Sequence, residues 1–296
     1  MSEEIQNNQK EAAENKAPVI QNSSSAMLDA FKSELASTIN SVYVNSIGRE
    51  CQFKEVSVKE QKTLSKIMIE NESRKDIVYD TQCALINKLC VNEGFDVYNL
   101  TEFDRIRILM EIYQNNYFKN DITYKCPECG CENKYKLDFT KFIQRFNEFN
   151  LEDVKYSTDD SQRNYTFTLN YPNVRVISNF YKSYVKKYKN TTNKEREVLD
   201  NLANVDYINL YIKQIEMVNK TTGKKTVADL STMTYSDVEQ LLSLLPQNIM
   251  FSEENGVLKY ITTQFIDKIN NVFHYEKCMQ CGAETKEGLG SVIDFF

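Results

Sequence analysis

The sequence contains no tryptophan, four prolines and a single histidine in 296 residues. Because histidine is the side chain that most often transfers protons at neutral pH, histidine-dependent catalysis has one candidate, His274. His274 lies in a β-prone run close to Cys278, where aromatic packing explains it as well as a functional role does. Glycine-rich phosphate loops, Gly-x-Ser-x-Gly elbows and His-Glu-x-x-His helices are also absent. These absences favour a protein that is not an enzyme.

Long apolar runs and a secretory signal are missing as well. No run approaches the roughly 18 apolar residues that a membrane helix requires, and eight cysteines are too few for a disulfide scaffold in a chain of this length. We therefore expect a soluble protein of a reducing cytoplasm, without a membrane partner. The formal net charge of −6 also makes nucleic acid an unlikely partner. A hydrophobic content of 41% is enough for a core.

Against this background the motif Cys-x-x-Cys-Gly occurs twice, once near the middle of the chain and once near residue 280. Two residues between the thiolates let a tight turn direct both sulfurs at one metal, and the glycine permits the positive φ that closes the turn. Four thiolates make a closed tetrahedral site with no position for water or substrate. The sequence therefore predicts a structural zinc ion bound by Cys126, Cys129, Cys278 and Cys281.

The flanks of the two motifs are also alike. β-Prone runs precede them at 122–125 and 272–275, and apolar runs follow at 135–139 and 291–296. A strand, a cysteine turn and a strand, present twice, indicate a zinc ribbon. The inner cysteines are separated by the 148 residues 130–277, whereas a compact ribbon has roughly 15 to 20. Either the ribbon carries an inserted domain, which we favour, or the two motifs bind different metals or different chains.

The other four cysteines need a different interpretation. Cys131 extends the first motif to Cys-x-x-Cys-x-Cys, so it is either a spare thiol, which we favour, or a substitute ligand. Cys51, Cys83 and Cys90 have no partner at metal-ligand spacing, and packing in the core is the simpler role for them.

The pattern of the N-terminal half predicts a tail, a hairpin and several helices. Residues 1–26 have almost nothing to bury and are expected to be a disordered tail, and the spacing of Leu28, Phe31, Leu35 and Ile39 predicts an amphipathic helix from Met27. The run 42–56 around Gly48 predicts a β-hairpin. Helices are expected from Val58 after a Ser57-x-x-Glu60 capping box, over 76–91 before Gly94, after Thr101, and over 139–149.

Residues 151–270 have the pattern of an inserted α+β domain. The runs 165–169 and 174–177 predict a hairpin around Asn170-Tyr171-Pro172-Asn173. Helices are predicted over 205–218, from a second capping box, Ser236-x-x-Glu239, to Pro246, and over 257–272.

We therefore expect an α+β fold in four parts. The tail 1–26 precedes a helical domain, 27–150, which holds the β-hairpin and the first cysteine motif. The inserted α+β domain, 151–270, comes next, and residues 271–296 carry the second motif and complete the ribbon.

Between Tyr181 and Lys194 lies the most basic stretch of the chain, in which five lysines alternate with three tyrosines and no acid occurs. Basic residues interleaved with aromatic ones can follow a phosphate backbone and stack on bases. A solvated helix face, whose lysine stems cover the tyrosines, explains the pattern better because Glu195 and Glu197 follow at once. Docking of an acidic partner is a further possibility for this face.

Several short motifs occur in an order typical of one family. They are Val-x-Ser-x-Gly (44–48, with Val44 and Gly48 at its ends), Phe53-Lys54, Glu60-Gln61-Lys62-x-Leu64, Leu100-Thr-x-Phe-Asp-Arg-Ile106, and Cys-x-x-Cys-Gly. In this order the chain resembles the baseplate hub family of T-even-type contractile-tailed bacteriophages. The resemblance implies a hub subunit or a hub assembly factor, with other baseplate and tail proteins as partners. It also implies assembly in the host cytoplasm and a final location in the virion tail.

Two other classes of protein share part of this pattern. A nucleic-acid-binding zinc ribbon, such as a viral transcription accessory factor, would concentrate basic residues near the cysteines, but the first motif has mixed charge around it. A metalloenzyme would need an open metal position, which four thiolates do not leave.

Overall fold

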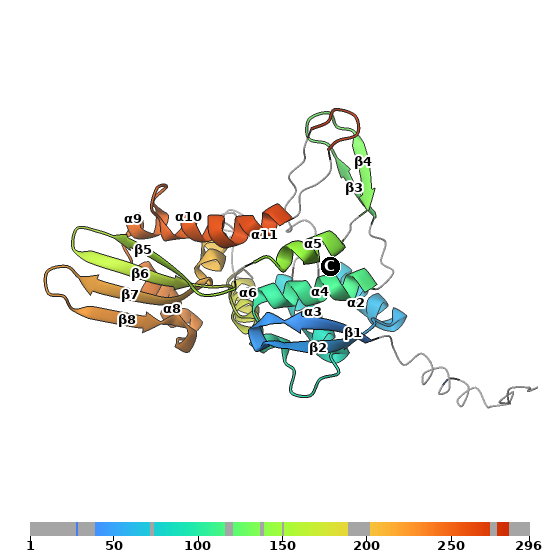
Figure 1. The fold of residues 1–296 in the computed structure, drawn as a ribbon, viewed down its shortest axis with the longest axis horizontal. Coiled ribbons are helices and arrows are strands. Elements are labelled where there is room, and N and C mark those ends of the chain that lie inside the picture. The colour runs from blue at the N-terminus through green and yellow to red at the C-terminus, as the bar shows by residue number, and fades with distance from the viewer. Residues whose placement is uncertain are drawn as a thin grey trace, which may run out of the picture. The chain divides into compact units, whose positions relative to one another are not determined.

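The structure is a computed structural model that describes residues 28, 39–71, 74–115, 121–136, 139–149, 151–188, 202–272 and 277–283 (Figure 1). The chain divides into two compact units, 1–38 and 39–296. Every helix and strand described below belongs to the second unit. The predicted tail and the helix from Met27 fall outside the described residues, apart from the helical Leu28. Within the described residues the fold is α+β, as predicted, with three antiparallel sheets.

The first sheet is the predicted hairpin. Strands β1 (Ile39–Val44) and β2 (Arg49–Lys54) pair antiparallel across the 3₁₀ turn η1 (Asn45–Ile47). Gly48 closes that turn with a φ of 61°, in the left-handed region that glycine adopts without strain. Alternate residues of both strands are buried. Ile39, predicted as the last apolar position of a helix, instead begins β1 opposite Lys54, so that part of the prediction was wrong.

Helix α2 (Val58–Glu70) begins at the predicted residue, and the capping box is formed. The backbone N–H of Ser57 donates to the Glu60 carboxylate at 2.8 Å, and the Glu60 N–H donates to the Ser57 hydroxyl at 3.3 Å. Helix α3 (Lys75–Leu89) stops two residues before the predicted end. Cys90 is extended there and bridges to Phe53 beside β2, so strand pairing ends the helix before Gly94 is reached.

Helix α4 (Glu102–Asn115) follows the 3₁₀ turn η2 (Val97–Asn99), and Thr101 caps it as predicted, accepting from the Asp104 N–H at 3.3 Å. Helix α5 (Phe139–Phe146) ends three residues earlier than predicted and packs on α4. The ring of Phe103 lies 4.7 Å from that of Phe146 and 5.1 Å from that of Tyr171, centroid to centroid. This aromatic cluster joins residues far apart in the sequence.

The four-stranded sheet consists of β5 (Val154–Asp159), β6 (Arg163–Leu169), β7 (Ile212–Asn219) and β8 (Lys225–Asp229), in that order. The predicted pairing of 165–169 with 174–177 was wrong, because β6 pairs with β5 and β7. Residues 174–177 instead begin α6 (Val174–Tyr188). The Asn173 side chain accepts the Arg175 N–H at 2.9 Å, and the buried residues Val174, Ile177 and Phe180 follow at helical spacing.

The predicted helix 205–218 was also wrong in its second half. Within the described residues the helix covers 202–209, and from Ile212 the chain forms β7. β7 has hydrogen-bonding partners on both sides, β6 and β8, and this tertiary pairing decides the conformation of a sequence whose local pattern is ambiguous. In the turn between β7 and β8, Gly223 has a φ of 65°, in the left-handed region.

The remaining helices are short. η3 (Leu230–Thr232) leads to α8 (Tyr235–Ser243), whose cap is Thr234 and not the predicted box that starts at Ser236. Thr234 accepts the Asp237 N–H at 3.3 Å. α9 (Gln247–Phe251) precedes the predicted helix 257–272, which is present as α10 (Val257–Ile261), the π-helical turn η4 (Thr262–Ile266) and α11 (Asp267–Val272).

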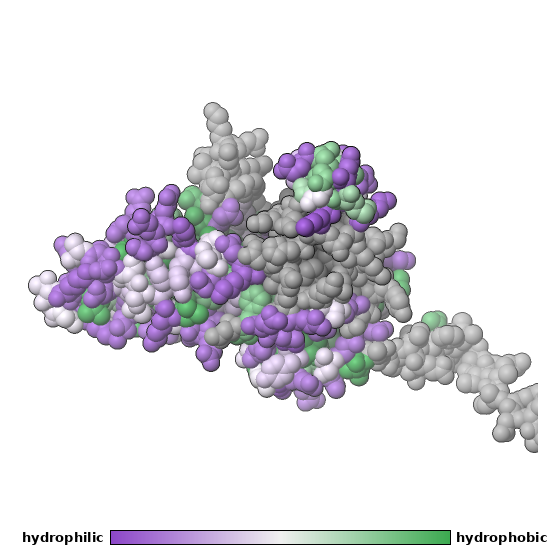
Figure 2. All heavy atoms as spheres, turned by 45° about the horizontal axis from the view of Figure 1, so that its top comes forward, coloured by the Kyte–Doolittle hydropathy of each residue, from purple (hydrophilic) through white to green (hydrophobic). Residues whose placement is uncertain are grey.

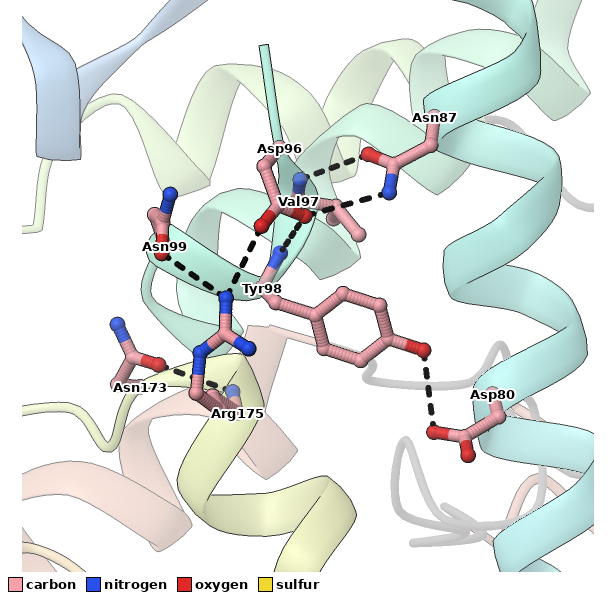
Figure 3. A network of polar contacts seen from close by, with 8 residues as sticks. All are labelled: Asp80, Asn87, Asp96, Val97, Tyr98, Asn99, Asn173 and Arg175. Atoms are coloured by element: carbon pink, nitrogen blue, oxygen red, sulfur yellow. Dashed lines mark hydrogen bonds and ion pairs between the residues drawn. The ribbon is translucent and has the colours of Figure 1, made fainter. Parts of the chain in front are cut away.

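Helix α6 is attached to α3 and η2 by a polar network (Figure 3). The Arg175 guanidinium donates to Asp96 at 3.0 Å and to Asn99 at 3.2 Å, and the Tyr98 hydroxyl donates to Asp80 at 3.2 Å. Asp80 also accepts from the Ser178 hydroxyl of α6 at 2.6 Å. Residues from both sides of position 150 thus share one core, while the boundaries of the predicted domains stay a prediction.

Candidate metal centre

The first cysteine motif is the turn between β3 (Asp121–Lys125) and β4 (Glu132–Lys136), which pair antiparallel. The Cys126 N–H donates to the Cys131 carbonyl at 2.8 Å, and the Gly130 N–H donates to the Cys126 carbonyl at 2.8 Å. Gly130 has a φ of 71°, which is the conformation that the glycine of the motif was predicted to supply.

The second motif repeats this geometry. The Cys278 N–H donates to the Ala283 carbonyl at 2.9 Å, the Gly282 N–H donates to the Cys278 carbonyl at 2.8 Å, and the φ of Gly282 is again 71°. Of the predicted strand at 272–275, Val272 is the last residue of α11; the rest of that run, together with His274 and the run 291–296, lies outside the described residues.

The two turns bring the four predicted cysteines together. Their sulfur atoms all lie within 4.8 Å of one another, with Cys126 3.6 Å from Cys281 and Cys129 3.6 Å from Cys278. Disulfide sulfurs would be about 2.05 Å apart, so these pairs are not bonded. Zinc–sulfur bonds of about 2.3 Å in a tetrahedron place the sulfurs about 3.8 Å apart. The separations therefore match a four-thiolate metal site and do not match a pair of disulfides.

Asn133 holds the two turns against each other, and the sequence analysis did not identify it. Its side chain, 3% exposed, accepts the Met279 N–H at 3.1 Å and donates to the Cys131 carbonyl at 3.1 Å. Its amide also lies 3.6 Å from the sulfur of Cys278, to which it donates. An asparagine three residues after the motif carries no signal by itself, because its partner on the second turn is 146 positions away.

Electrostatics differ among the four thiols. Hydrogen bonds from the backbone N–H groups of Cys281 and Gln280 and from Asn133 lower the pKa of the Cys278 thiol to about 6. The N–H of Cys131 favours the thiolate of Cys129, but desolvation and the neighbouring thiols outweigh it and raise the pKa of Cys129 to about 12. Neighbouring thiols oppose one another's ionisation in so small a space, and a divalent cation bound by all four would remove the repulsion between the thiolates.

The other cysteines lie outside this cluster. The half-buried Cys131 donates from its sulfur to the Glu132 carbonyl at 3.6 Å. Cys51 and Cys83 are buried in the core, as expected, and Cys90 is half-buried. Burial raises the pKa of the Cys83 thiol to about 12, which keeps it protonated and unsuited to metal binding at neutral pH.

Two of the three described lysines in the basic stretch 181–194 form ion pairs within the chain. Lys182 pairs with Asp80 at 2.7 Å, and Lys187 pairs with Glu239 at 2.8 Å. Lys189 and Lys194 lie outside the described residues. These ion pairs fit the solvated helix face better than a groove for nucleic acid.

Two of the motifs that carried the family resemblance are in direct contact. Asp104, on α4, accepts the backbone N–H groups of Asn45 at 3.0 Å and of Ser46 at 2.8 Å, both in the turn of the first hairpin. The Ser46 hydroxyl in return accepts the N–H of Thr101 at 2.9 Å. The order of these motifs therefore reflects one structural unit, in which the hairpin turn is pinned to the start of α4.

Comparison with known protein families matches residues 36–296 to the family described as T4 bacteriophage base plate protein. The match covers the hairpin, the four-stranded sheet and both cysteine motifs, and the chain belongs to this family. It is therefore a component of the phage baseplate, in the virion tail, with other phage proteins as partners and a structural, non-enzymatic role. Searches of the curated proteins and of the solved structures give no match. None of the described helices is long and apolar enough to span a bilayer.

Proposed function

We propose that the protein is a structural or assembly component of the central hub of the baseplate. The observation that carries this proposal is the family match over residues 36–296. The hub in particular is supported by the motifs 44–48 and 100–106, whose resemblance to hub proteins led to the prediction and which contact each other through Asp104.

We further propose that Cys126, Cys129, Cys278 and Cys281 bind one zinc ion within a single chain. The donor set supports zinc because soft thiolates in a closed tetrahedral arrangement are its usual structural ligands. The ion would join two segments separated by the 148 residues 130–277, half of the chain, as a disulfide can do in secreted proteins. A metal link suits a protein that folds in a reducing cytoplasm, where disulfides do not persist.

The metal proposal is tested by measuring metal content and oligomeric state together. We would compare the wild type with Cys126→Ser and Cys278→Ser, one from each turn, and use Cys131→Ser as the matched control. One zinc per monomer, lost in both ligand variants and kept in the control, supports the proposal. Two zinc ions per chain, or metal held only by dimers, would overturn the intrachain site.

The hub proposal needs a separate measurement, because a zinc-bound protein is not necessarily a hub protein. Quantitative mass spectrometry of purified baseplates and of their assembly intermediates would locate the protein. Presence in the central intermediate supports the hub, and presence only in peripheral intermediates contradicts it. Binding to nucleic acid that weakens steeply with salt would instead favour the competing interpretation as a nucleic-acid-binding zinc ribbon.

A further inference from the structure

A pocket of ≈ 390 Å³ opens between the helix 202–209, α8 and α9. Its wall includes the apolar side chains of Leu242 and Met250, and Phe251 stands at its edge with 54% of its surface exposed. This volume is at the lower end of the range for small-molecule sites. It is suited to one long side chain, and the exposed aromatic ring offers apolar surface for a partner to cover.

Two side chains in the wall of the pocket, Asp206 and Asn209, carry acceptor oxygens that have no donor within the described residues. Asp206 and Asn209, one turn apart on the helix 202–209, both line it. The side-chain oxygen of Asn209 is buried and has no hydrogen-bond partner. Within the described residues Asp206 has no hydrogen bond or ion pair, and the nearby Lys187 pairs with Glu239 at 2.8 Å. A buried acceptor left unpaired costs free energy, so a donor that enters the pocket gains more there than in water.

The charged side chains of the pocket favour a hydrogen-bond donor that carries a positive charge. Asp206 and Glu239 both line it, and Lys187 neutralises one of the two carboxylates. Desolvation first, and then the charge of Glu239, raise the pKa of Asp206, while Lys187 lowers it. A cation beside Asp206 would replace the water that this carboxylate has lost. An anion such as a phosphate would instead meet uncompensated negative charge.

We propose that this pocket receives a lysine or arginine side chain of another baseplate protein, whose apolar stem packs on Leu242 and Met250 while its cationic head pairs with Asp206 and donates to Asn209. Long basic side chains combine an apolar stem with a charged head, which is the combination that the pocket offers. The identity of the partner rests on the proposed function, whereas the chemistry of the pocket does not.

The full-length Phe251→Trp variant gives a direct readout, because the natural chain has no tryptophan and the new indole is the only one. We would titrate this variant with acetyl-arginine amide and acetyl-lysine amide, and with the neutral isosteres acetyl-citrulline amide and acetyl-norleucine amide. Saturable changes in fluorescence with the cationic probes, and at least about tenfold weaker binding of their isosteres, are expected. Equal binding of neutral and cationic probes, or no saturable binding, would overturn the proposal.

Two substitutions separate recognition from folding. In the same background Asp206→Asn should weaken the cationic probes about tenfold, while Glu254→Gln, which removes an exposed carboxylate outside the pocket, should not. Asn209→Leu should weaken binding and at the same time raise the denaturation midpoint, because it removes an unpaired buried acceptor. A merely structural Asn209 would lower the midpoint, and that result contradicts the proposal.

The source of the cation is tested separately. Spermine, a polyamine, should bind no more tightly than acetyl-arginine amide; much tighter binding would make this a polyamine site and overturn the proposal. In assembled tails, a benzophenone amino acid at position 251 should crosslink to a partner segment that contains lysine or arginine, and Asp206→Asn should reduce the yield. Absence of such a crosslink in tails that contain the protein would also overturn the proposal. Absence of the protein from the tails would instead count against the proposed function.

Discussion

Arg105 and Glu102 form a two-pronged ion pair inside the protein, one turn apart on α4. Two nitrogens of the guanidinium donate to the two carboxylate oxygens at 2.6 and 2.8 Å, and the side chains are 2% and 8% exposed. Gln82 accepts from the remaining arm at 2.9 Å, the Tyr79 hydroxyl donates to Glu102 at 2.5 Å, and the guanidinium lies 4.3 Å from the centre of the Tyr79 ring. The charged groups of the motif 100–106 are therefore part of the core.

Removal of one partner of this pair should be strongly destabilising. We expect Arg105→Met to lower the free energy of unfolding by about 3–5 kcal/mol, because Glu102 would keep a buried charge without compensation. Chemical denaturation followed by circular dichroism measures this. Lys66→Met is the control, since it breaks the exposed Lys66–Glu70 pair and should cost no more than about 1 kcal/mol. Similar losses in the two variants would contradict the assigned role.

Loss of the metal should destabilise the fold. If one ion joins the two cysteine turns, a strong chelator should lower the free energy of unfolding by about 5 kcal/mol, the closure entropy of a loop of on the order of 150 residues. Denaturation with and without chelator gives this difference. Cys129→Ser should be insensitive to the chelator and already destabilised, whereas Cys131→Ser should respond like the wild type. If the chelator left the free energy of unfolding of the wild type unchanged, a metal link between the two turns would be refuted.

The cap of α8 can be assigned by two neighbouring substitutions. Thr234→Ala should cost about 1 kcal/mol, since the Asp237 N–H would lose its acceptor. Ser236→Ala should change stability by no more than about 0.5 kcal/mol, because Ser236 is exposed and lies inside the helix. Thermal or urea denaturation of both variants is sufficient. If Ser236→Ala cost more stability than Thr234→Ala, the cap would be the box that the sequence predicts at Ser236.

The capping box of α2 should make stability depend on pH. Desolvation raises the pKa of Glu60, but hydrogen bonds from Lys88 and Ser57 outweigh it and lower the pKa. A carboxyl whose pKa is lower in the folded state stabilises the fold above its unfolded pKa of about 4.3, and this contribution disappears as the pH falls through the folded pKa.

We therefore expect the wild type to lose more stability than Glu60→Gln as the pH falls below about 4. Glutamine keeps the capping geometry but has no charge to titrate. Urea denaturation at several pH values compares the two proteins, and parallel curves would show that Glu60 contributes nothing to the pH dependence.

Local signals predicted local structure well. The hairpin around Gly48, the capping box at Ser57 and the Thr101 cap depend on contacts between near neighbours, and all three are present. The meeting of the cysteine turns was also predictable, because two matching motifs supply the four thiols that one tetrahedral metal site requires. The identical φ values of Gly130 and Gly282 show that the two motifs repeat in backbone structure as well as in sequence.

The errors occurred where distant partners decide the outcome. Residues 174–177 and 212–218 are short stretches of mixed apolar and polar residues that suit either a helix or a strand. The pairing of β7 with β6 and β8 decides the second case. The burial of Glu102 and Arg105 was missed because Tyr79 and Gln82, which complete their network, lie about one helix earlier in the chain. Asn133 was missed for the same reason.

Because the two cysteine turns lie far apart in the sequence, their meeting also has a fixed place in the order of synthesis. The sulfur of Cys126 lies beside that of Cys281, and Cys129 lies beside Cys278. Since the ribosome delivers residues from the N-terminus, the first turn waits until nearly all of the family-matched region has been made before its partner emerges. A chain that stops before the second turn therefore offers two thiols instead of four, so the metal site that we propose would form only in chains that contain both turns.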